Sequence, residues 1–283
     1  MRMGEFTYIL EDRVMQSLED CGTIVLEING TYVNNYYLFV NKTKKYLVRK
    51  IKENEFEKID YTCNHSIKPK DSRQSGFLHG LDDNSIQLAL CLGSAGTGKT
   101  TLALSYALEQ KMLHDKKIVL SKAAVPIGRG KAFGPVPGDI KEKYAPYLSS
   151  YEIVLKKILG PKSKGYIRAM FEKQDIKYEP IEFVRGNTYE DCIFILDECQ
   201  NLDWHELKTV ISRIGQGSKI ILLGDVYQSD VYFKHPQESG VQKLLYSNQF
   251  QNSPYTFNIE LTKQYRGPLA DLIYKIDNER KDT

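Results

Sequence analysis

Short apolar runs recur along most of this chain, and each is followed by small or polar residues. The runs are too short to cross a membrane and are typical of strands buried on both faces of a parallel sheet. Helical patterns such as Thr101–Leu108 occupy the stretches between them. This alternation predicts an α/β fold with a parallel sheet. The runs are Ile86–Leu92, Lys117–Ser121, Ile193–Leu196 and Lys219–Leu223, and the more polar Asn258–Thr262 resembles a last strand.

The first part of the chain, to about Thr62, has a different pattern. It is rich in Tyr, Val, Ile and Phe and is interrupted by polar pairs. An Asn-Gly pair at positions 29–30 separates Ile24–Ile28 from Thr31–Val33. Such a pair between two apolar runs predicts a β-hairpin.

Further strands are expected at Tyr36–Val40 and Tyr46–Ile51. Together these patterns predict a small antiparallel β module over residues 1–65, followed by a second domain over residues 66–283. The module has no catalytic or metal-binding motif, which favours a role in packing or oligomerisation.

The segment Gly93–Thr100 follows the first apolar run and fits the phosphate-binding pattern G-x-x-x-x-G-K-[ST]. Glycines let several backbone N–H groups point at one anion, and the N-terminus of the next helix adds partial positive charge. Lys99 is expected to reach the β- and γ-phosphates of ATP, and the Thr100 hydroxyl to hold Mg²⁺. The loop residues expected to bind the nucleotide are Gly93, Ser94, Ala95, Gly96, Thr97, Gly98, Lys99, Thr100 and Thr101.

Two acids follow the apolar run Ile193–Leu196. Asp197 is in the position of a Walker-B aspartate, which binds Mg²⁺. Glu198, one residue further, is expected to act as general base for the attacking water. Kinases of the P-loop class usually lack this glutamate, so the pair favours hydrolysis, with a small-molecule kinase as an alternative.

Other polar residues stand where they could contact the same nucleotide. Asp225 or Gln228, after the run Lys219–Leu223, could sense the γ-phosphate and position water. Arg266, past the last run, could supply charge to the transition state, although a salt bridge at a helix start explains it equally well. Gln74, in a helical stretch through Leu81, could read an adenine edge.

Composition narrows the class of protein only slightly. The 283 residues include 41% hydrophobic and 27% charged residues, and the net charge of +3 selects no partner. The five cysteines form no C-x-x-C pair, which is typical of a reduced, cytosolic protein. With no membrane-length apolar run and no signal-peptide pattern at the start, we expect a cytoplasmic protein without membrane contact.

Positive charge is concentrated between Ser121 and Lys173. This segment has 11 Lys and Arg against 4 Asp and Glu, so its net charge is 11 − 4 = +7. Basic groups neutralise phosphates and aromatic rings stack on bases, so the mixture favours single-stranded RNA or DNA as partner. A charged helical surface is the alternative. The tyrosines interleaved with the charge are Tyr144, Tyr147, Tyr151 and Tyr166.

An ordered set of motifs extends from Ile67 onward. They are Ile67-Lys68-Pro69, Gln74, the loop Gly93–Thr100, Pro137-Gly138-Asp139, Glu142-Lys143, Arg185-Gly186, Leu196–Leu202, His205–Gly215, Gly217–Lys219 and Gly224-Asp225.

In this order and spacing the motifs resemble the PhoH family of P-loop ATPases, in particular the ATPase half of PIN–PhoH fusion proteins. The resemblance implies a RecA-like core related to superfamily 1 helicases, ATP hydrolysis, RNA or DNA as partner, and ring-shaped oligomers of six subunits. It also implies that Gln74 reads adenine and that Arg213 or Arg266 acts as an arginine finger.

The sequence departs from the family pattern at several positions. Lys122-Ala123 replaces the usual Arg-Pro, Gly134–Gly138 replaces Gly-Phe-Leu-Pro-Gly, and Asn187 replaces the second arginine of Arg-Gly-Arg. The start of the chain is too short for a PIN nuclease and lacks its acidic cluster, so nuclease activity is not expected.

The sequence therefore predicts a Mg²⁺-dependent ATPase that couples hydrolysis to binding or helicase-like remodelling of single-stranded nucleic acid. The alternative is a nucleotide-gated ATPase that recruits a protein partner and has no helicase activity.

Overall fold

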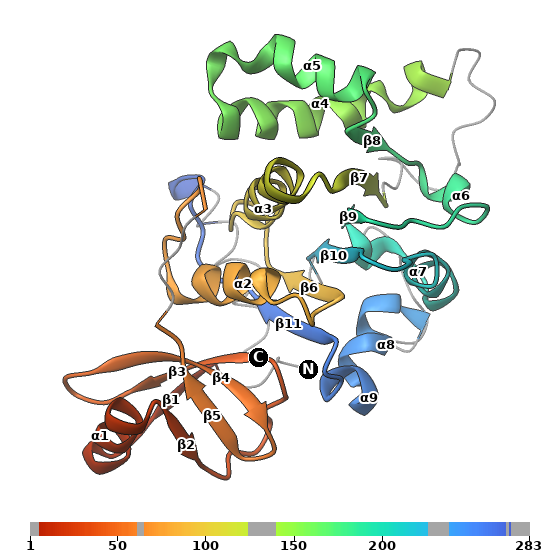
Figure 1. Cartoon of the computed structure of the whole chain (residues 1–283). Coiled ribbons are helices and arrows are strands. Elements are labelled where there is room, and N and C mark those ends of the chain that lie inside the picture. The colour runs from red at the N-terminus through yellow and green to blue at the C-terminus, as the bar shows by residue number, and fades with distance from the viewer. Residues whose placement is uncertain (1–5, 61–64, 124–139, 226–237, 270–271, 273–283) are drawn as a thin grey trace.

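The computed structural model describes residues 6–60, 65–123, 140–225, 238–269 and 272, with the backbone alone for residues 140–147. Figure 1 shows a small β-rich module at the N-terminus beside a larger α/β domain. The two meet where helix α2 (Ser72–Asp82) and strand β11 (Thr256–Glu260) lie next to the module's sheet.

A six-stranded sheet forms the centre of the larger domain, and all its neighbouring strands run parallel, in the order β11-β6-β10-β9-β7-β8. One strand, β10, separates the P-loop strand β6 from β9, which is a RecA-like arrangement. The predicted α/β fold with a parallel sheet is confirmed. The other strands are β6 (Leu88–Leu92), β7 (Lys117–Lys122), β8 (Ile176–Tyr178), β9 (Cys192–Asp197) and β10 (Lys219–Gly224).

Helices cover both faces of this sheet, which is why its central strands β6, β9 and β10 are nearly continuous apolar runs. On one face, Leu81, Leu104 and Leu155 belong to one buried cluster with the strands. On the other face, Leu207 and Val241 belong to a second cluster. The helices are α3 (Lys99–His114), α4 (Ile140–Leu159), α5 (Lys164–Glu172), α6 (Ile181–Val184), α7 (Trp204–Ile211), α8 (Gly240–Tyr246) and α9 (Asn248–Gln251), with 3-10 turns at Pro161–Ser163 and Cys199–Asn201.

The N-terminal module is a sheet in the order β1-β3-β4-β5-β2, and helix α1 (Asp12–Cys21) packs on it through Met15 and Leu18. Its strand pairs are antiparallel except one, because β1 pairs in parallel with β3. The long connection through α1 makes this parallel pairing possible. The prediction of an antiparallel module is thus corrected to a mixed sheet. The strands are β1 (Thr7–Ile9), β2 (Thr23–Val25), β3 (Tyr36–Val40), β4 (Lys45–Lys52) and β5 (Glu55–Lys58).

The hairpin predicted at positions 29–30 was wrong. The chain turns there, with φ +75° at Gly30, but the residues that follow form no strand, and β2 pairs with β5 instead. Local side chains take the hydrogen bonds that a hairpin ladder would have used. The Tyr32 N–H donates to the Tyr37 hydroxyl over 2.7 Å, and the Thr31 hydroxyl donates to the Ile28 carbonyl over 2.7 Å.

Several predicted features lie outside the described residues. They are Gln228, the loop Gly134–Gly138 and most of the stretch from Leu269 to about Ile276, where the sequence predicts a C-terminal helix. Within the ranges that the structure describes, no helix is both long and apolar enough to span a membrane.

Candidate nucleotide site

The P-loop joins strand β6 to helix α3 at the carboxyl edge of the large sheet. Its first residue is held by the neighbouring strand, because the Gly93 N–H donates to the Gly224 carbonyl over 3.0 Å. The Lys99 ammonium group donates to the carbonyls of Gly93 and, over 3.1 Å, of Ser94. The loop is therefore closed around Lys99 at the N-terminus of α3, where the helix dipole favours an anion.

The segment that follows β11 packs against the P-loop. The Tyr265 N–H donates to the Gly96 carbonyl over 3.0 Å, and the Gln264 amide donates to the Ser94 hydroxyl over 2.7 Å. Gly96 has φ +90°, and a Cβ there would lie 2.7 Å from the Gln264 Oε1 and 2.9 Å from the Arg266 Cγ. Only glycine fits this contact, which brings the exposed Arg266 next to the loop of its own chain.

The rest of the loop leads into the first turn of α3. Ala95 is exposed, and Thr97 is buried with its hydroxyl donating to the Ser94 carbonyl over 2.9 Å. Gly98 is the N-cap of α3, with φ +97°, and Thr101 is half-buried in the first turn. The structure thus brings the predicted phosphate-binding residues together at one helix terminus.

Thr100 and Asp197 meet across the sheet, although 97 residues separate them in sequence. The Thr100 hydroxyl donates to the Asp197 carboxylate over 3.2 Å. Burial raises the pKa of Asp197, and the charge of Glu198 raises it further, while Lys122 and Lys99 oppose these effects. Two hard oxygen donors and an excess of negative charge fit Mg²⁺, which keeps few protein ligands.

In the part of the chain that the structure describes, no group of three or more His, Cys, Asp and Glu side chains could hold a metal. A Mg²⁺ ion at Thr100 and Asp197 would therefore take its remaining ligands from water and from a bound nucleotide.

Glu198 directly follows strand β9 in a left-handed backbone conformation, with φ 57°. For a residue with a side chain this conformation is strained, and such strain gathers at functional sites. The Glu198 N–H donates to the Asp197 carboxylate over 3.0 Å, and the Gln200 amide donates to the Glu198 carboxylate over 2.8 Å. The Lys122 ammonium lies 3.7 Å from the same carboxylate, which is 40% exposed.

Gln200 connects the ends of two strands and has no assigned role in the sequence analysis. Its side-chain oxygen accepts the Asp225 N–H over 3.0 Å while its nitrogen donates to Glu198. Asp225 is buried, with 4% of its surface exposed, and lies at the end of β10 beside the end of β9. Gln200 thus fixes Glu198 relative to Asp225. Gln264, which donates to the Ser94 hydroxyl, is the second site residue for which no sequence motif predicted a role.

Gln74 is buried on α2 with its amide turned toward the P-loop. Its oxygen accepts the Lys70 N–H over 2.8 Å, and its nitrogen donates to the Thr97 carbonyl over 2.9 Å. A primary amide can make four such bonds, so one N–H and one lone pair remain beyond these two bonds to described residues. Asp71, the N-cap of α2, accepts both the Gln74 N–H, over 2.9 Å, and the Tyr265 hydroxyl, over 2.6 Å.

The two arginines considered as fingers lie in different places. Arg266 contacts the P-loop, as described above. Arg213 follows α7, and its carbonyl accepts the Tyr189 N–H over 2.8 Å. Tyr189 comes just before β9, so Arg213 lies at the amino end of that strand, whereas the P-loop lies at the carboxyl edge. Within one chain the structure does not bring Arg213 to the other site residues.

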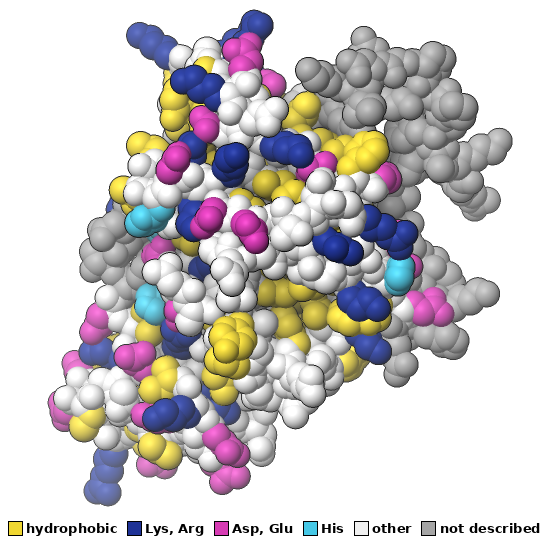
Figure 2. All heavy atoms as spheres, turned by 45° about the vertical axis from the view of Figure 1, so that its right-hand side comes forward, with side chains coloured by type: hydrophobic (Ala, Val, Ile, Leu, Met, Phe, Trp, Pro, Cys, Tyr) yellow, Lys and Arg dark blue, Asp and Glu magenta, His cyan; other side chains and the backbone are white. Residues whose placement is uncertain are grey.

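The basic segment is only partly described, since residues 124–139 and the side chains of residues 140–147 fall outside the described part. Tyr166 is 53% exposed, but Tyr151 is buried on α4 and donates its hydroxyl to the Ser121 carbonyl over 2.9 Å. Tyr151 is therefore a core residue and no stacking platform. On the face in Figure 2, Lys and Arg side chains are interspersed with Asp and Glu. Within the basic segment, the Lys156 ammonium lies 3.4 Å from the Glu152 carboxylate.

The matching family model and the similar curated proteins point to the same family. The family model described as PhoH-like protein matches residues 66–277. Protein PhoH2 of Bacillus subtilis (strain 168) is 34% identical over 209 residues, and a PhoH-like protein of the same organism is 35% identical over 196 residues. These alignments cover 73% and 66% of this chain but 46% and 59% of the relatives. The chain thus spans about half the length of the curated relatives it matches.

Solved structures with partial similarity include the Pif1 helicase from Candida albicans, with a TM-score of 0.40 and 19% identity over 76% of this chain and 44% of the helicase. The Sulfolobus solfataricus SWI2/SNF2 ATPase core in complex with dsDNA has a TM-score of 0.39 and 13% identity over 70% of this chain and 45% of that one.

Proposed function

Because this chain belongs to the PhoH-like protein family, we propose that it is a P-loop ATPase that binds ATP with Mg²⁺ and hydrolyses it. The contact between the Thr100 hydroxyl and the Asp197 carboxylate, with Glu198 beside it, is the observation that supports this most directly. The contact brings together two side-chain oxygens that can bind the Mg²⁺ of a bound nucleotide. The Glu198 carboxylate lies beside them and is not one of these two ligands.

Nucleotide binding uses groups that are already positioned. Lys99 exchanges the Gly93 and Ser94 carbonyls for phosphate oxygens, at a helix terminus that favours negative charge. The N–H and the lone pair that remain on the Gln74 amide match the acceptor and donor on the adenine edge.

In the hydrolytic step Glu198 accepts a proton from a water molecule. The water oxygen forms a bond to the γ-phosphorus, the bond from that phosphorus to the β,γ-bridging oxygen breaks, and ADP leaves with that oxygen. Bound Mg²⁺ would neutralise charge on the phosphate oxygens. Gln200 holds the Glu198 carboxylate in place and ties it to Asp225, which we propose as the residue that senses the γ-phosphate. Gln228 is a second candidate for that role.

Arg266 is proposed as the arginine that stabilises the transition state from within the same chain, since its side chain lies against Gly96. Arg213 could reach a nucleotide only in a neighbouring copy, as in a ring of six subunits. A ring of six subunits is therefore also proposed. Mixing Glu198→Gln subunits with Arg213→Ala subunits distinguishes Arg266 acting within one chain from Arg213 acting on a neighbour, because only donation across an interface restores activity in the mixture.

Single-stranded nucleic acid is proposed as the partner whose binding is coupled to ATP turnover, and the +7 segment from Ser121 to Lys173 supports this proposal. The alternative, a nucleotide-gated ATPase that recruits a protein, is supported by the burial of Tyr151 and by the pairing of Lys156 with Glu152. Both observations reduce the basic and aromatic surface that is available to a nucleic acid.

The test is release of inorganic phosphate from ATP, measured with and without single-stranded RNA and DNA. Glu198→Gln is expected to keep nucleotide affinity while losing about 10²–10⁴-fold in rate, the usual range for a general base. Glu172→Gln, an exposed carboxylate on α5, is the matched control and should keep the parental rate. Parental turnover in Glu198→Gln would exclude the general-base assignment, and a phosphorylated small molecule in place of free phosphate would identify a kinase.

Stimulation by oligonucleotides distinguishes the two partner classes. Replacing Lys141, Lys143, Lys156 and Lys157 with glutamine should then reduce binding and stimulation while basal hydrolysis stays nearly unchanged. Unchanged oligonucleotide binding in this variant would end the proposal that the basic segment binds nucleic acid.

A further inference from the structure

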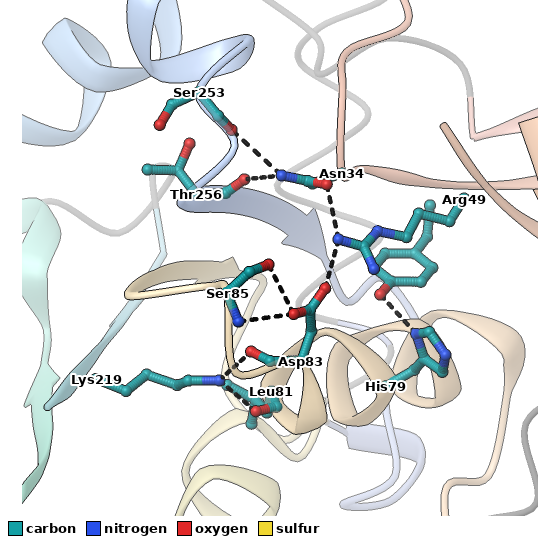
Figure 3. Close-up of polar contacts among 10 residues, drawn as sticks. Asn34, Arg49, His79, Leu81, Asp83, Ser85, Lys219, Ser253 and Thr256 are labelled. Atoms are coloured by element: carbon teal, nitrogen blue, oxygen red, sulfur yellow. Dashed lines mark hydrogen bonds and ion pairs between the residues drawn. The ribbon is translucent and has the colours of Figure 1, made fainter. Parts of the chain in front are cut away.

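Helix α2 contacts the P-loop at one end and the N-terminal module at the other. At its N-terminal end the Gln74 amide holds the Thr97 carbonyl, and Asp71 holds the Tyr265 hydroxyl. At its C-terminal end the module binds His79 and Asp83, as Figure 3 shows. A displacement of α2 by the module would therefore reach the nucleotide site.

Arg49 on strand β4 forms an ion pair at the C-terminal end of α2. Its guanidinium lies 2.7 Å from the carboxylate of Asp83, the C-cap of α2, and also donates to the Asn34 side chain over 2.7 Å (Figure 3). Burial by itself raises the pKa of Asp83, but hydrogen bonds from Ser85 and the charge of Arg49 lower it on balance. The pair is thus charged and largely shielded, with 13% of Arg49 and 22% of Asp83 exposed.

The second contact joins Tyr36 on β3 to His79, with 2.7 Å between the hydroxyl and Nδ1. Burial lowers the pKa of His79, and Arg49 lowers it further, which favours the neutral ring. Burial raises the pKa of Tyr36, which favours the protonated hydroxyl, so the two groups share a hydrogen bond between uncharged partners.

Two glycines one turn apart let α2 fit tightly at this interface. A Cβ on Gly76 would lie 3.0 Å from the ring of Tyr36 and 3.2 Å from Ile259. A Cβ on Gly80 would lie 2.6 Å from the ring of Phe257 on β11. The helix is therefore closely packed between the module and the edge strand of the large sheet.

The module also touches α2 one residue before Gln74. The guanidinium of Arg73 lies 4.0 Å from the ring centre of Phe6 and donates to the Glu260 carbonyl over 2.8 Å. On the opposite side Lys219 of β10 donates to the carbonyls of Leu81 and, over 2.9 Å, of Asp83 (Figure 3).

We propose that the N-terminal module is a positioning element for the nucleotide site. Arg49 and Tyr36 are positioning residues that hold α2, and they act on the bound nucleotide through Gln74 and the P-loop. This inference rests on the proposed function. It predicts that the module sets the affinity for ATP and the preference for adenine over guanine. The rate of the chemical step depends instead on the carboxyl edge of the large sheet around Lys99, Asp197 and Glu198, called the P-loop edge below.

The decisive variant is Arg49→Met, which removes the ion pair with Asp83. We expect it to raise KM for ATP by about threefold or more, as for coupled residues in contact, with kcat within about twofold. The ratio of kcat/KM for ATP to that for GTP should fall. Arg49→Lys, which keeps a charge toward Asp83, should restore part of both values. Lys44→Met is the matched control, because it breaks an ion pair to Glu19 inside the module, away from α2, and should leave KM unchanged.

A double-mutant cycle tests the route of action. If Arg49 acts through Gln74, Arg49→Met should change KM little in a Gln74→Ala background, whereas independent effects would multiply. Tyr36→Phe removes one hydroxyl and keeps the ring, so it decides the matter if Arg49→Met does not fold. It should raise KM in the same direction by a smaller factor.

Four results have distinct meanings. A parent protein that neither binds nor hydrolyses ATP refutes the proposed function. A parent that hydrolyses ATP, with variants that lower only the melting temperature and leave KM and base preference unchanged, refutes this inference alone. Multiplicative effects in the Gln74→Ala background overturn the route through Gln74. A rise in KM that disappears in that background supports the inference.

Discussion

The P-loop edge and the interface between the module and α2 are both built from residues far apart in sequence, but the two are specified differently. At the P-loop edge, Thr100 meets Asp197 across 97 residues. Beside the interface, Asn34, whose side-chain oxygen accepts from Arg49, donates its amide to the Ser253 carbonyl before β11 over 3.2 Å, across 219 residues. The first contact joins two recognisable motifs, whereas the second joins residues that belong to no pattern.

The physical reason lies in the parallel sheet. The carboxyl ends of β6, β9 and β10 must meet at one edge, so any motif that ends such a strand has a known neighbour. No comparable rule places a loop asparagine against a carbonyl of another domain. Contacts of the second kind hold the module against the large domain and belong to no recognisable sequence pattern.

The largest expected effect would break the P-loop edge itself. Lys99→Ala should abolish ATP turnover and weaken nucleotide binding, because Lys99 is the cation around which the loop closes. Turnover and equilibrium binding of a fluorescent ATP analogue measure the two effects. Lys117→Ala, at the exposed start of β7, is the control and should behave as the parent. Turnover that survives in Lys99→Ala would place the chemistry elsewhere.

The next prediction compares Arg266, which contacts the P-loop, with Arg213, which lies at the opposite end of strand β9. Arg266→Ala should lower kcat by up to about 10³-fold, the lower end of the range for arginine fingers, whereas Arg213→Ala should leave a dilute, monomeric protein unchanged. The measurement is kcat as a function of protein concentration. A loss in Arg213→Ala that appears only at high concentration would instead identify donation between subunits.

Much of the fold follows from the sequence, and the exceptions have identifiable causes. The apolar runs located the strands of the large sheet apart from the short β8. Helix α1 was missed, although Met15 and Leu18 have helical spacing, because Tyr- and Val-rich neighbours suggested strands throughout. The Asn-Gly pair correctly predicted a turn at Gly30. The strand after it does not form, because Tyr37 takes the hydrogen bond of Tyr32.

Side-chain roles were harder to predict than elements. Tyr151 stands in a basic stretch, yet it is spaced four residues from Leu155 on the buried face of α4. The spacing of Tyr151 from Leu155 indicated a core position, whereas the basic residues around it suggested a surface position. Gln200 and Gln264 were not assigned because their partners become neighbours only when the strand ends meet.

A smaller effect, on stability, tests the interface. Gly80→Ala should destabilise the protein by about 1–3 kcal/mol, since the added methyl group overlaps the ring of the buried Phe257. Gly165→Ala on α5 is the matched control, because nothing lies within 4 Å of its Cβ position. It should be neutral or stabilise by up to about 1 kcal/mol through helix propensity. Urea unfolding measures both, and equal effects would mean that α2 is not tightly packed there.

The smallest expected effect concerns His65, which joins α2 to α3. Its Nε2 lies 3.0 Å from the carboxylate of Asp82, its Nδ1 contacts the carboxylate of Glu109, and Tyr106 packs edge-on against the ring. Burial by itself lowers the pKa of His65, but its hydrogen bonds to the carboxylates of Asp82 and Glu109 outweigh this effect, so the pKa is raised on balance. A raised pKa means that the folded state binds this proton more tightly than the unfolded state does. The stabilisation is therefore complete below the unfolded pKa of about 6.5 and is lost as pH rises through the higher folded value.

His65→Gln should consequently reduce the free energy of unfolding more at pH 6 than at pH 9, with a difference of about 1 kcal/mol or less. His114→Gln, at the exposed end of α3, is the control for replacing a histidine. Equal losses at both pH values in His65→Gln would mean that the ring acts by packing against Tyr106, without a charged link between the two helices.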